Sequence, residues 1–435
     1  MFFKKSIMKK IAFFLNNQNI SNIDYKNIQK GNPGIGGSEY LCVLVTLELT
    51  KRKNYDIYLL SEEKVKGLPE INNIKCRNIE NALEIYSNKM DLFVIDSKHF
   101  DFNLAKKFPK AKFILWINNT MKGNTMKMCL NYPNIVKLVH VSREMYDLYR
   151  DTLVFPKTTY IFNAVPLNKA DIYRNIIPNS IRRNNVVYVG SIVPNKGFHI
   201  LAQAWRSVLT KVPDAELYVI GSGRLYSENQ QLGEYGIAEE SYEKQFMPYL
   251  IDENNKIIKS VHFMGIMGAE KNELFSTCRV GVPNPSGKSE TFGYTAVEMA
   301  SMGCRITTKY CPGYIDTVYN TKNLYKQDSD LSTYIINLLL DRSDQSIEYK
   351  KTLMYFSENF SIEKVVNQWE ELLADPSKEI LYEKSDRSNY QLKNIKEIIR
   401  KYCPNIIKRY IPSIEHIYRS SFARKYLKTE CPYIG

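Results

Sequence analysis

Short apolar runs alternate with amphipathic stretches along most of the chain, in two successive sets. Apolar runs bounded by turn residues are typical of strands buried on both faces of a parallel sheet. The first set predicts strands at 11–15, 56–60, 92–95, 113–117 and 136–141, and the second at 186–189, 216–220, 261–263, 280–282 and 305–308. The alternation predicts an α/β protein with two parallel sheets covered by helices.

Helices are expected between these strands where apolar residues recur three and four positions apart. A helix at 39–51 would place Leu41, Leu44 and Val45 on one face, and it ends in basic residues, the favourable charge for a C-terminus. Another would start after Ser361, a residue type favoured at the N-cap.

These patterns divide the chain into five parts. We expect a first α/β domain at 8–167, a polar linker at 168–185, a second α/β domain at 186–360, a single helix at 361–375 and a basic helical tail at 376–435.

Composition narrows the class of protein. The chain has 435 residues, 44% hydrophobic and 24% charged, which is ordinary for a globular protein of two domains. No apolar stretch approaches the length of a membrane-spanning helix, and the N-terminal segment lacks a small-residue cleavage site. The eight cysteines show no paired spacing. We therefore expect a cytoplasmic protein with reduced cysteines.

The tail carries half of the net charge of +14, because residues 376–435 hold 13 Lys and Arg against 6 Asp and Glu. The tail has three possible interpretations, of which the first two stay open. The tail is a solvated helical appendage packed on the body, or a basic amphipathic surface for an anionic membrane leaflet. The third, nucleic-acid binding, is not expected, because no stacking motif accompanies the charge.

Two glutamates eight positions apart mark the candidate site. Glu290 lies in a loop rich in Pro and Gly, and Glu298 lies about one turn into the helix that follows. The N-terminus of a helix attracts phosphate. Carboxylates on both sides of an anion site suit a ligand with hydroxyls at both ends and a charged centre, which is the shape of a nucleotide-sugar.

The segment around Glu290 and Glu298 resembles the donor-binding signature of retaining glycosyltransferases of family 4. The resemblance rests on the spacing of the two glutamates, on Thr291-Phe292-Gly293 between them and on the Met-Ala-Ser-Met-Gly that follows. The resemblance implies the GT-B fold, in which two Rossmann-like domains face each other across a cleft. It places Glu290 at the donor sugar and Glu298 at the ribose. It also makes the first domain the acceptor side, the second the donor side, and 361–375 the helix that crosses between them.

Glycine-rich segments supply the expected phosphate contacts. The run from Gly190 to Lys196 resembles the phosphate-binding loop of the family, with Lys196 in the first turn of a helix. Ser191 stands where the family normally has Arg, which removes one diphosphate contact. Gly36 and Gly37 resemble the loop that closes over the donor diphosphate.

The remaining expected contacts lie where strands end, the edge at which open α/β sheets bind ligands. Gly221, Gly223 and Met264 are expected to contact the donor. The family's usual histidine in the first domain has no direct counterpart, so His99 and Asn118 are the candidates beside the catalytic Glu290 and Lys196.

No metal or other cofactor is expected. The Asp-x-Asp spelling at Asp328-Ser329-Asp330 precedes an apolar helix, and helix capping explains it.

The sequence therefore predicts a retaining glycosyltransferase that moves a hexose-type sugar from a nucleotide diphosphate to a saccharide. The acceptors usual in the family and the basic tail favour a lipid-linked saccharide as the acceptor. The enzyme would then act at the inner face of the membrane, in bacterial surface polysaccharide or lipopolysaccharide synthesis. Two alternatives stay open: a sugar-nucleotide epimerase on the same fold, and a non-catalytic basic adaptor.

Overall fold

The computed structural model describes residues 8–121, 123–167, 182–224, 230–388 and 392–419, which form two compact units. Unit 1 holds the described residues up to Ala164 and those from Ile362 onward, and unit 2 holds Val165–Ser361. Within unit 2, the first and last segments are hydrogen-bonded to each other, because the Val165 N–H donates to the Phe360 carbonyl at 2.8 Å. Most of the predicted linker, 168–181, lies outside the described residues.

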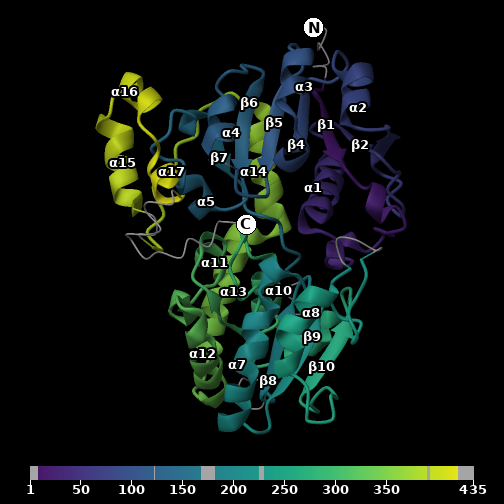
Figure 1. The fold of residues 1–435 in the computed structure, drawn as a ribbon. Helices are drawn as coiled ribbons and strands as arrows, with labels where there is room; N and C mark the ends of the chain where they lie inside the picture. The colour runs from purple at the N-terminus through teal and green to yellow at the C-terminus, as the bar shows by residue number, and fades with distance from the viewer. Residues whose placement is uncertain (1–7, 122, 168–181, 225–229, 389–391, 420–435) are drawn as a thin grey trace. The chain divides into compact units, whose positions relative to one another are not determined.

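Unit 1 contains a parallel sheet of seven strands in the order β3-β2-β1-β4-β5-β6-β7 (Figure 1). The strands are β1 Lys10–Leu15, β2 Asp56–Ser61, β3 Asn72–Lys75, β4 Leu92–Asp96, β5 Phe113–Ile117, β6 Ile135–His140 and β7 Thr158–Tyr160. In register, Ile11 of β1 lies between Ile57 of β2 and Leu92 of β4. The strand order reverses between β1 and β4, and ligands bind α/β sheets at such a switch point.

All five strands predicted in this unit are present, whereas β3 and β7 were not predicted. The β3 sequence, Asn-Asn-Ile-Lys, is polar because β3 is an edge strand and none of its residues is fully buried. A polar edge strand has no apolar run that a sequence pattern could detect.

Unit 1 also includes the helices of the C-terminal region. Its helices are α1 Gly37–Arg52, α2 Ile79–Tyr86, α3 Phe102–Lys107, α4 Gly123–Met128, α5 Arg143–Asp147, α14 Ile362–Ala374, α15 Lys393–Tyr402, α16 Asn405–Tyr410 and α17 Ile414–Arg419, with short 3-10 turns η1 Gln18–Ile20, η2 Ile28–Lys30, η3 Ser97–His99 and η4 Phe155–Lys157. Trp369 of α14 packs against the sheet, with its ring 4.8 Å from Trp116 and 5.9 Å from Phe13. Arg52 at the end of α1 forms an ion pair with Glu370 at 2.9 Å.

Unit 2 contains a parallel sheet of five strands in the order β10-β9-β8-β11-β12. The strands are β8 Asn185–Val189, β9 Glu216–Ile220, β10 Val261–Gly265, β11 Val280–Gly281 and β12 Arg305–Ile306, and a separate pair is formed by β13 Thr308–Lys309 and β14 Leu324–Tyr325. The strand predicted at 305–308 is therefore two short strands in different sheets. The order reverses between β8 and β11, which is the switch point of this unit.

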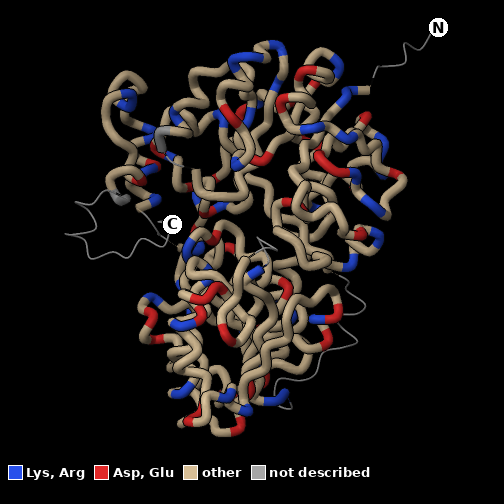
Figure 2. Tube along the Cα trace, turned by 45° about the vertical axis from the view of Figure 1, so that its right-hand side comes forward, with Lys and Arg blue, Asp and Glu red and all other residues tan. Residues whose placement is uncertain are grey.

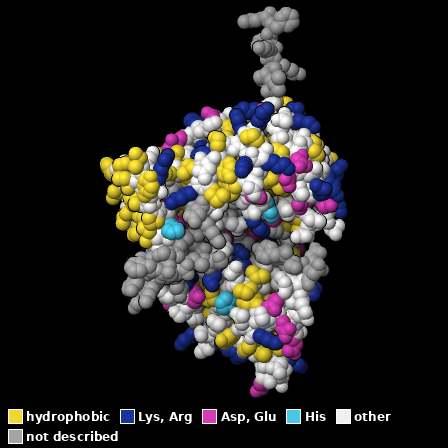
Figure 3. Space-filling view, turned by 45° about the horizontal axis from the view of Figure 1, so that its top comes forward, with side chains coloured by type: hydrophobic (Ala, Val, Ile, Leu, Met, Phe, Trp, Pro, Cys, Tyr) yellow, Lys and Arg dark blue, Asp and Glu magenta, His cyan; other side chains and the backbone are white. Residues whose placement is uncertain are grey.

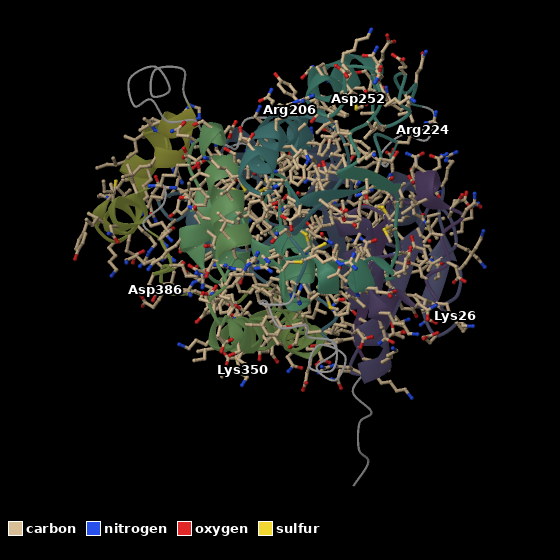
Figure 4. The ribbon with its side chains drawn as sticks, turned by 90° about the horizontal axis from the view of Figure 1, so that it is seen from below. Lys26, Arg206, Arg224, Asp252, Lys350 and Asp386 are labelled. Carbon is tan, nitrogen blue, oxygen red and sulfur yellow. The ribbon has the colours of Figure 1, made fainter. Side chains whose placement is uncertain are left out.

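Seven helices and four short turns surround this sheet in the described part of unit 2. They are α7 Phe198–Lys211, α8 Glu240–Phe246, α9 Lys271–Thr277, α10 Tyr294–Ser301, α11 Pro312–Thr317, α12 Leu331–Leu340, α13 Ser346–Phe360, η6 Pro194–Lys196, η7 Met247–Tyr249, η8 Thr321–Asn323 and η9 Asp328–Asp330. Trp205 of α7 is fully buried in the core beneath the sheet. On the outer side of α7, Arg206 donates to the carbonyls of Tyr249 and Ile251, next to Asp252 (Figure 4).

Lys and Arg residues are distributed along the chain of both units as well as the tail (Figure 2). Arg182, at the end of the segment predicted to be a polar linker, is buried instead, and its guanidinium donates to the carbonyls of Cys278 and Met302. Among the described residues, none of the helices combines the length and apolar character needed to cross a bilayer.

Candidate functional site

The candidate site of unit 2 is built at the switch point, where β8 and β11 end side by side. The chain leaves β8 through Gly190 and reaches η6, which ends at Lys196. It leaves β11 through a loop that ends at Glu290. The topology therefore brings together two predicted residues that are 94 positions apart.

Lys196 and Glu290 form an ion pair, with Nζ 3.2 Å from Oε2. The prediction that Lys196 lies in the first turn of the long helix is wrong. Lys196 ends η6, and Gly197, in the left-handed region at φ 67°, separates it from α7. A side chain at Gly197 would lie 2.6 Å from the backbone N of Ser286, so glycine permits η6 to approach the 284–290 loop.

The Glu290 carboxylate has further partners on both oxygens. Asn284 donates to Oε2 at 3.0 Å, and the Gly293 N–H donates to Oε1 at 2.9 Å. The Tyr314 hydroxyl lies 3.4 Å from Oε2. Burial raises the pKa of Glu290, but Lys196 and these hydrogen bonds outweigh burial and hold the pKa below its usual value. Glu290 is therefore an ionised, oriented acceptor of hydrogen bonds.

Thr291, Phe292 and Gly293 connect Glu290 to α10. The Phe292 side chain is buried and packs edge-to-face on Phe360 at 5.2 Å, so this aromatic ring anchors the loop in the core. Thr291 is buried as well. Gly293, at φ 77°, is the N-cap of α10, and a side chain there would meet the ring of Tyr314 at 2.6 Å.

Glu298 lies in the second turn of α10 and is buried. Its Oε1 is 3.0 Å from Nζ of Lys271, the first residue of α9. Lys271 was not predicted as a site residue, because a lone lysine at the start of a helix has no recognisable sequence pattern.

The predicted turn glycines pack against each other where β8 and β9 end. A side chain at Gly221 would lie 1.9 Å from the Gly190 carbonyl oxygen, and one at Gly223 would lie 2.7 Å from the Cα of Ala238. Ser191 is buried in the same place, with its hydroxyl 3.5 Å from the Ser222 carbonyl. These residues fix the shape of the loop that carries Lys196.

Met264 lies apart from this group. It is on β10, the edge strand, two strands away from β8, and it is 43% exposed. Of these predicted residues, Lys196 and Glu290 are in contact, whereas Met264 lies at the outer edge of the sheet.

The first-domain residues gather at the switch point of unit 1. Gly36 is the N-cap of α1 and Gly37 is its first residue. Asn118, after β5, donates to the Asp96 carboxylate at the end of β4 at 3.0 Å. Burial raises the pKa of Asp96, and the nearby Glu39 raises it further. The Lys98 N–H, the Asn118 amide and His99 lower it, but the resulting pKa lies above the usual value. Asp96 and Glu39 were not predicted as site residues, although Asp96 ends an apolar strand.

The residues with the Asp-x-Asp spelling have structural roles. Asp328 is paired with Lys309 at 2.6 Å, and the Asp330 carboxylate accepts the Gln327 N–H as part of a capping box. Capping therefore holds for Asp330 at the short turn η9, whereas the predicted cap of the apolar helix α12 makes no side-chain hydrogen bond.

Two further residues at Glu290 were missed by sequence reasoning. Asn284 lies between two prolines and Tyr314 follows Pro312-Gly313. A side chain at Gly313 would lie 2.8 Å from the Phe292 N, so the Pro-Gly pair was the available signal that α11 approaches the Glu290 loop closely. A cavity of about 310 Å³ near Gly303 and Cys304 lies at the opposite end of α10 and belongs to another part of unit 2.

Chemically, unit 2 presents two Lys–Glu pairs, one in the loop before α10 and one in the second turn of α10. Each pair offers carboxylate oxygens for ligand hydroxyls and an ammonium group for an anion. The positive end of the helix dipole lies between them.

Part of the chain is similar in sequence to known proteins. Residues 183–341, which include both Lys–Glu pairs, match the family described as "Glycosyl transferases group 1". A segment of 168 residues is 22% identical to the Bacillus subtilis protein "Putative glycosyltransferase YtcC", and it covers 34% of this chain and 41% of that protein. The match thus spans about two fifths of that relative's length.

Similar solved structures cover most of the chain. The Anabaena protein Alr3699/HepE, in complex with UDP and glucose, has a TM-score of 0.59 at 13% identity, covering 85% of this chain and 100% of its own. Sucrose-phosphate synthase from Thermosynechococcus elongatus has a TM-score of 0.61 at 14% identity, covering 85% and 99%. With its two parallel Rossmann-like sheets, the chain has the predicted GT-B fold.

Proposed function

We propose that this chain is a retaining glycosyltransferase of family 4 that transfers a hexose-type sugar from a nucleotide diphosphate to a saccharide. The observation that carries the proposal is two ion pairs at and before the start of α10, Lys196 with Glu290 and Lys271 with Glu298. They lie inside the segment that matches the glycosyl transferase family, at the ligand edge of the sheet.

In this proposal Glu290 accepts hydrogen bonds from hydroxyls of the donor sugar, and Glu298 accepts them from the ribose. The bond between the anomeric carbon and the phosphate oxygen breaks, and the acceptor oxygen forms the new bond on the same face. The acceptor proton passes to the leaving phosphate. Lys196 and the N-terminus of α10 stabilise the negative charge that develops on that phosphate.

The UDP and glucose bound to the Anabaena protein support a nucleotide-sugar as donor. For the acceptor we propose a saccharide, in its lipid-linked form a substrate of bacterial surface polysaccharide or lipopolysaccharide assembly. The basic tail supports contact of a cytoplasmic enzyme with the inner face of the membrane.

The proposal is tested by incubating the protein with a panel of radiolabelled nucleotide-sugars and a membrane extract. We expect one donor to yield a labelled saccharide, and proton NMR of the product to show the anomeric configuration of the donor. An inverted product would exclude the retaining mechanism, and the absence of product with every donor would exclude the transferase.

A second candidate, a sugar-nucleotide epimerase, is favoured by one observation in unit 1. Asp96 has a raised pKa and lies near His99 and Glu39, so this unit carries groups able to exchange a proton. Incubation of the donor panel in D₂O separates the two functions. An epimerase introduces deuterium on a carbon of the sugar, whereas a transferase leaves the sugar carbons unlabelled.

A further inference from the structure

The tail helix α15 has the reverse of the usual arrangement of polar and apolar side chains. Lys393 and Lys396 point inward and are 2% and 0% exposed. Ile395, Ile398 and Tyr402, at helical spacing on the same helix, are exposed, Tyr402 by 77%. Lysine is seldom buried in water-soluble proteins, and an apolar stripe normally faces the core.

The exposed apolar side chains continue from α15 onto α16. Ile406 is 73% exposed and Tyr410 84% exposed. We call this surface the tail face; its members are Leu392, Ile395, Ile398, Tyr402, Ile406, Ile407, Tyr410 and Ile411. Figure 3 shows hydrophobic side chains gathered over α15 and α16, at the left of the view. Large exposed apolar patches mark interaction sites.

Buried ion pairs hold the inner side of the tail against unit 1. Lys393 lies 2.6 Å from Glu144 of α5. Arg150 pairs with Asp147, three positions earlier, and with Glu397 of α15 at 2.9 Å. The tail is therefore packed on the body, and the outward direction of its isoleucines is fixed by groups that cannot turn away without leaving buried charges unpaired.

The charge around the tail face is positive. Between residues 392 and 419 the acidic residues are Glu397 and Glu415. Glu397 is paired with Arg150, Arg400 and Lys401, and Glu415 with Lys396, so cations outnumber carboxylates around the face. Lys401 and Arg409 are exposed among the apolar side chains. A surface that is apolar and cationic complements an anionic lipid leaflet, since protein partners of an apolar face do not require this excess of positive charge.

A cavity of about 820 Å³ adjoins the tail face, between α16 and the segment that follows α4. Its lining combines three cations, Lys127, Lys408 and Arg409, with one carboxylate, Asp151, and with apolar side chains such as Ile411. This lining fits the phosphate of a lipid headgroup with the start of its chains.

We infer that the tail face is a docking surface for an anionic phospholipid bilayer, with Ile398, Ile406 and Tyr410 entering the interface. The inference names the surface for the membrane contact in the proposed function, and it does not depend on the donor site. Nucleotide is absent from its test, so a failure here leaves the transferase proposal intact.

The test is sedimentation of the full chain with vesicles of phosphatidylcholine alone or mixed with phosphatidylglycerol. Wild type should bind the anionic vesicles. The triple variant Ile398→Ser, Ile406→Ser, Tyr410→Ser should bind them at least about tenfold more weakly, because three apolar side chains no longer enter the interface. Lys401→Gln with Arg409→Gln should weaken binding about fivefold per cation and reduce its sensitivity to salt.

The matched control is Ile347→Ser with Met354→Ser, two exposed apolar residues of α13 in unit 2, which should leave vesicle binding unchanged. All changes are on exposed side chains, so thermal unfolding of each variant should match wild type. Deletion of 376–435 is unsuitable, because it would remove Lys393, the cation paired with Glu144, and the partners that the tail supplies to Arg150. The inference is overturned if wild type ignores anionic vesicles, if the triple variant binds like wild type, or if the face instead mediates self-association that the triple variant abolishes.

Discussion

Lys271 Nζ lies 3.0 Å from Glu298 Oε1, and the two side chains are 7% and 9% exposed. The pair joins the start of α9 to the second turn of α10. A carboxylate held at hydrogen-bond distance by a buried ammonium group is fixed in orientation. Glu298, the residue predicted to bind ribose, is therefore held in position by a lysine from a different helix.

Replacing Lys271 by Met should destabilise unit 2 by about 3–5 kcal/mol, because the Glu298 carboxylate is left buried without its partner. The double variant Lys271→Met, Glu298→Gln should recover much of that loss, since no buried charge is left unpaired. Urea unfolding of the single and double variants measures both values. Equal stability of Lys271→Met and wild type would show that the pair is not buried in solution.

Lys196→Met should lower kcat by about 10²-fold under the proposed mechanism, because the developing phosphate charge loses a cation. The loss of stability should stay near 1 kcal/mol, since Lys196 is one quarter exposed and Glu290 keeps Asn284 and the Gly293 N–H. Lys211→Met, at the far end of α7, is the matched control and should keep full activity.

The same variant should change the pH profile. Lys196 helps to hold the pKa of Glu290 below its usual value, and burial alone would raise it. Without Lys196 the carboxylate takes up a proton at higher pH, so the acid limb of kcat/KM should move upward. An acid limb that stays in place would mean that Glu290 is not the group whose ionisation limits activity.

Gly293→Ala should destabilise the protein by more than the cost of placing a non-glycine residue at positive φ. Both Gly293 and Gly236 have positive φ, 77° and 69°, but only Gly293 is crowded, by the Tyr314 ring at 2.6 Å. Gly236→Ala should therefore show the strain by itself, about 1–2 kcal/mol. Thermal unfolding of the two variants gives the difference, and equal losses would argue against the crowding.

His140→Phe should remove part of the acid sensitivity of the protein. His140 is fully buried, stacks on Tyr149 at 5.1 Å, and burial lowers its pKa to about 3. Above pH 6.5 the imidazole is neutral in both states. Below that pH the unfolded chain takes up a proton that the folded chain does not, so stability falls by about 1.4 kcal/mol per pH unit down to pH 3.

The measurement is urea unfolding of wild type and His140→Phe at pH 7.5 and pH 5. The variant should gain about 2 kcal/mol relative to wild type between these two pH values. An equal pH dependence of the two proteins would show that His140 titrates normally in the folded state.

The sequence predicted the central strands well, because burial on both faces requires a continuous apolar run. Phe113–Ile117 and Glu216–Ile220 match the structure to the residue. Strands that lack such a run were missed, namely the polar edge strand β3 and the short β7 and β14. Their pairing depends on neighbours in the sheet and not on their own composition.

For the site, the sequence located the loops but not the contacts within them. Lys196 and Glu290 were found because both occur in extended motifs. Lys271 and Asn284 were missed, since each is a single residue whose role arises only when another segment folds against it. The tail shows the same limit: its lysines count as surface charge in the sequence, but Lys393 and Lys396 are buried by a segment about 250 positions away.

The central claim is that unit 2 holds a nucleoside diphosphate through Glu298, and calorimetric titration of UDP, GDP and ADP tests it most directly. Wild type should bind one of the three, and Glu298→Ala should bind it about 10–100-fold more weakly, since the hydrogen bonds to a charged carboxylate are lost. If none of the nucleotides binds, or if Glu298→Ala binds as tightly as wild type, the account of this site is contradicted.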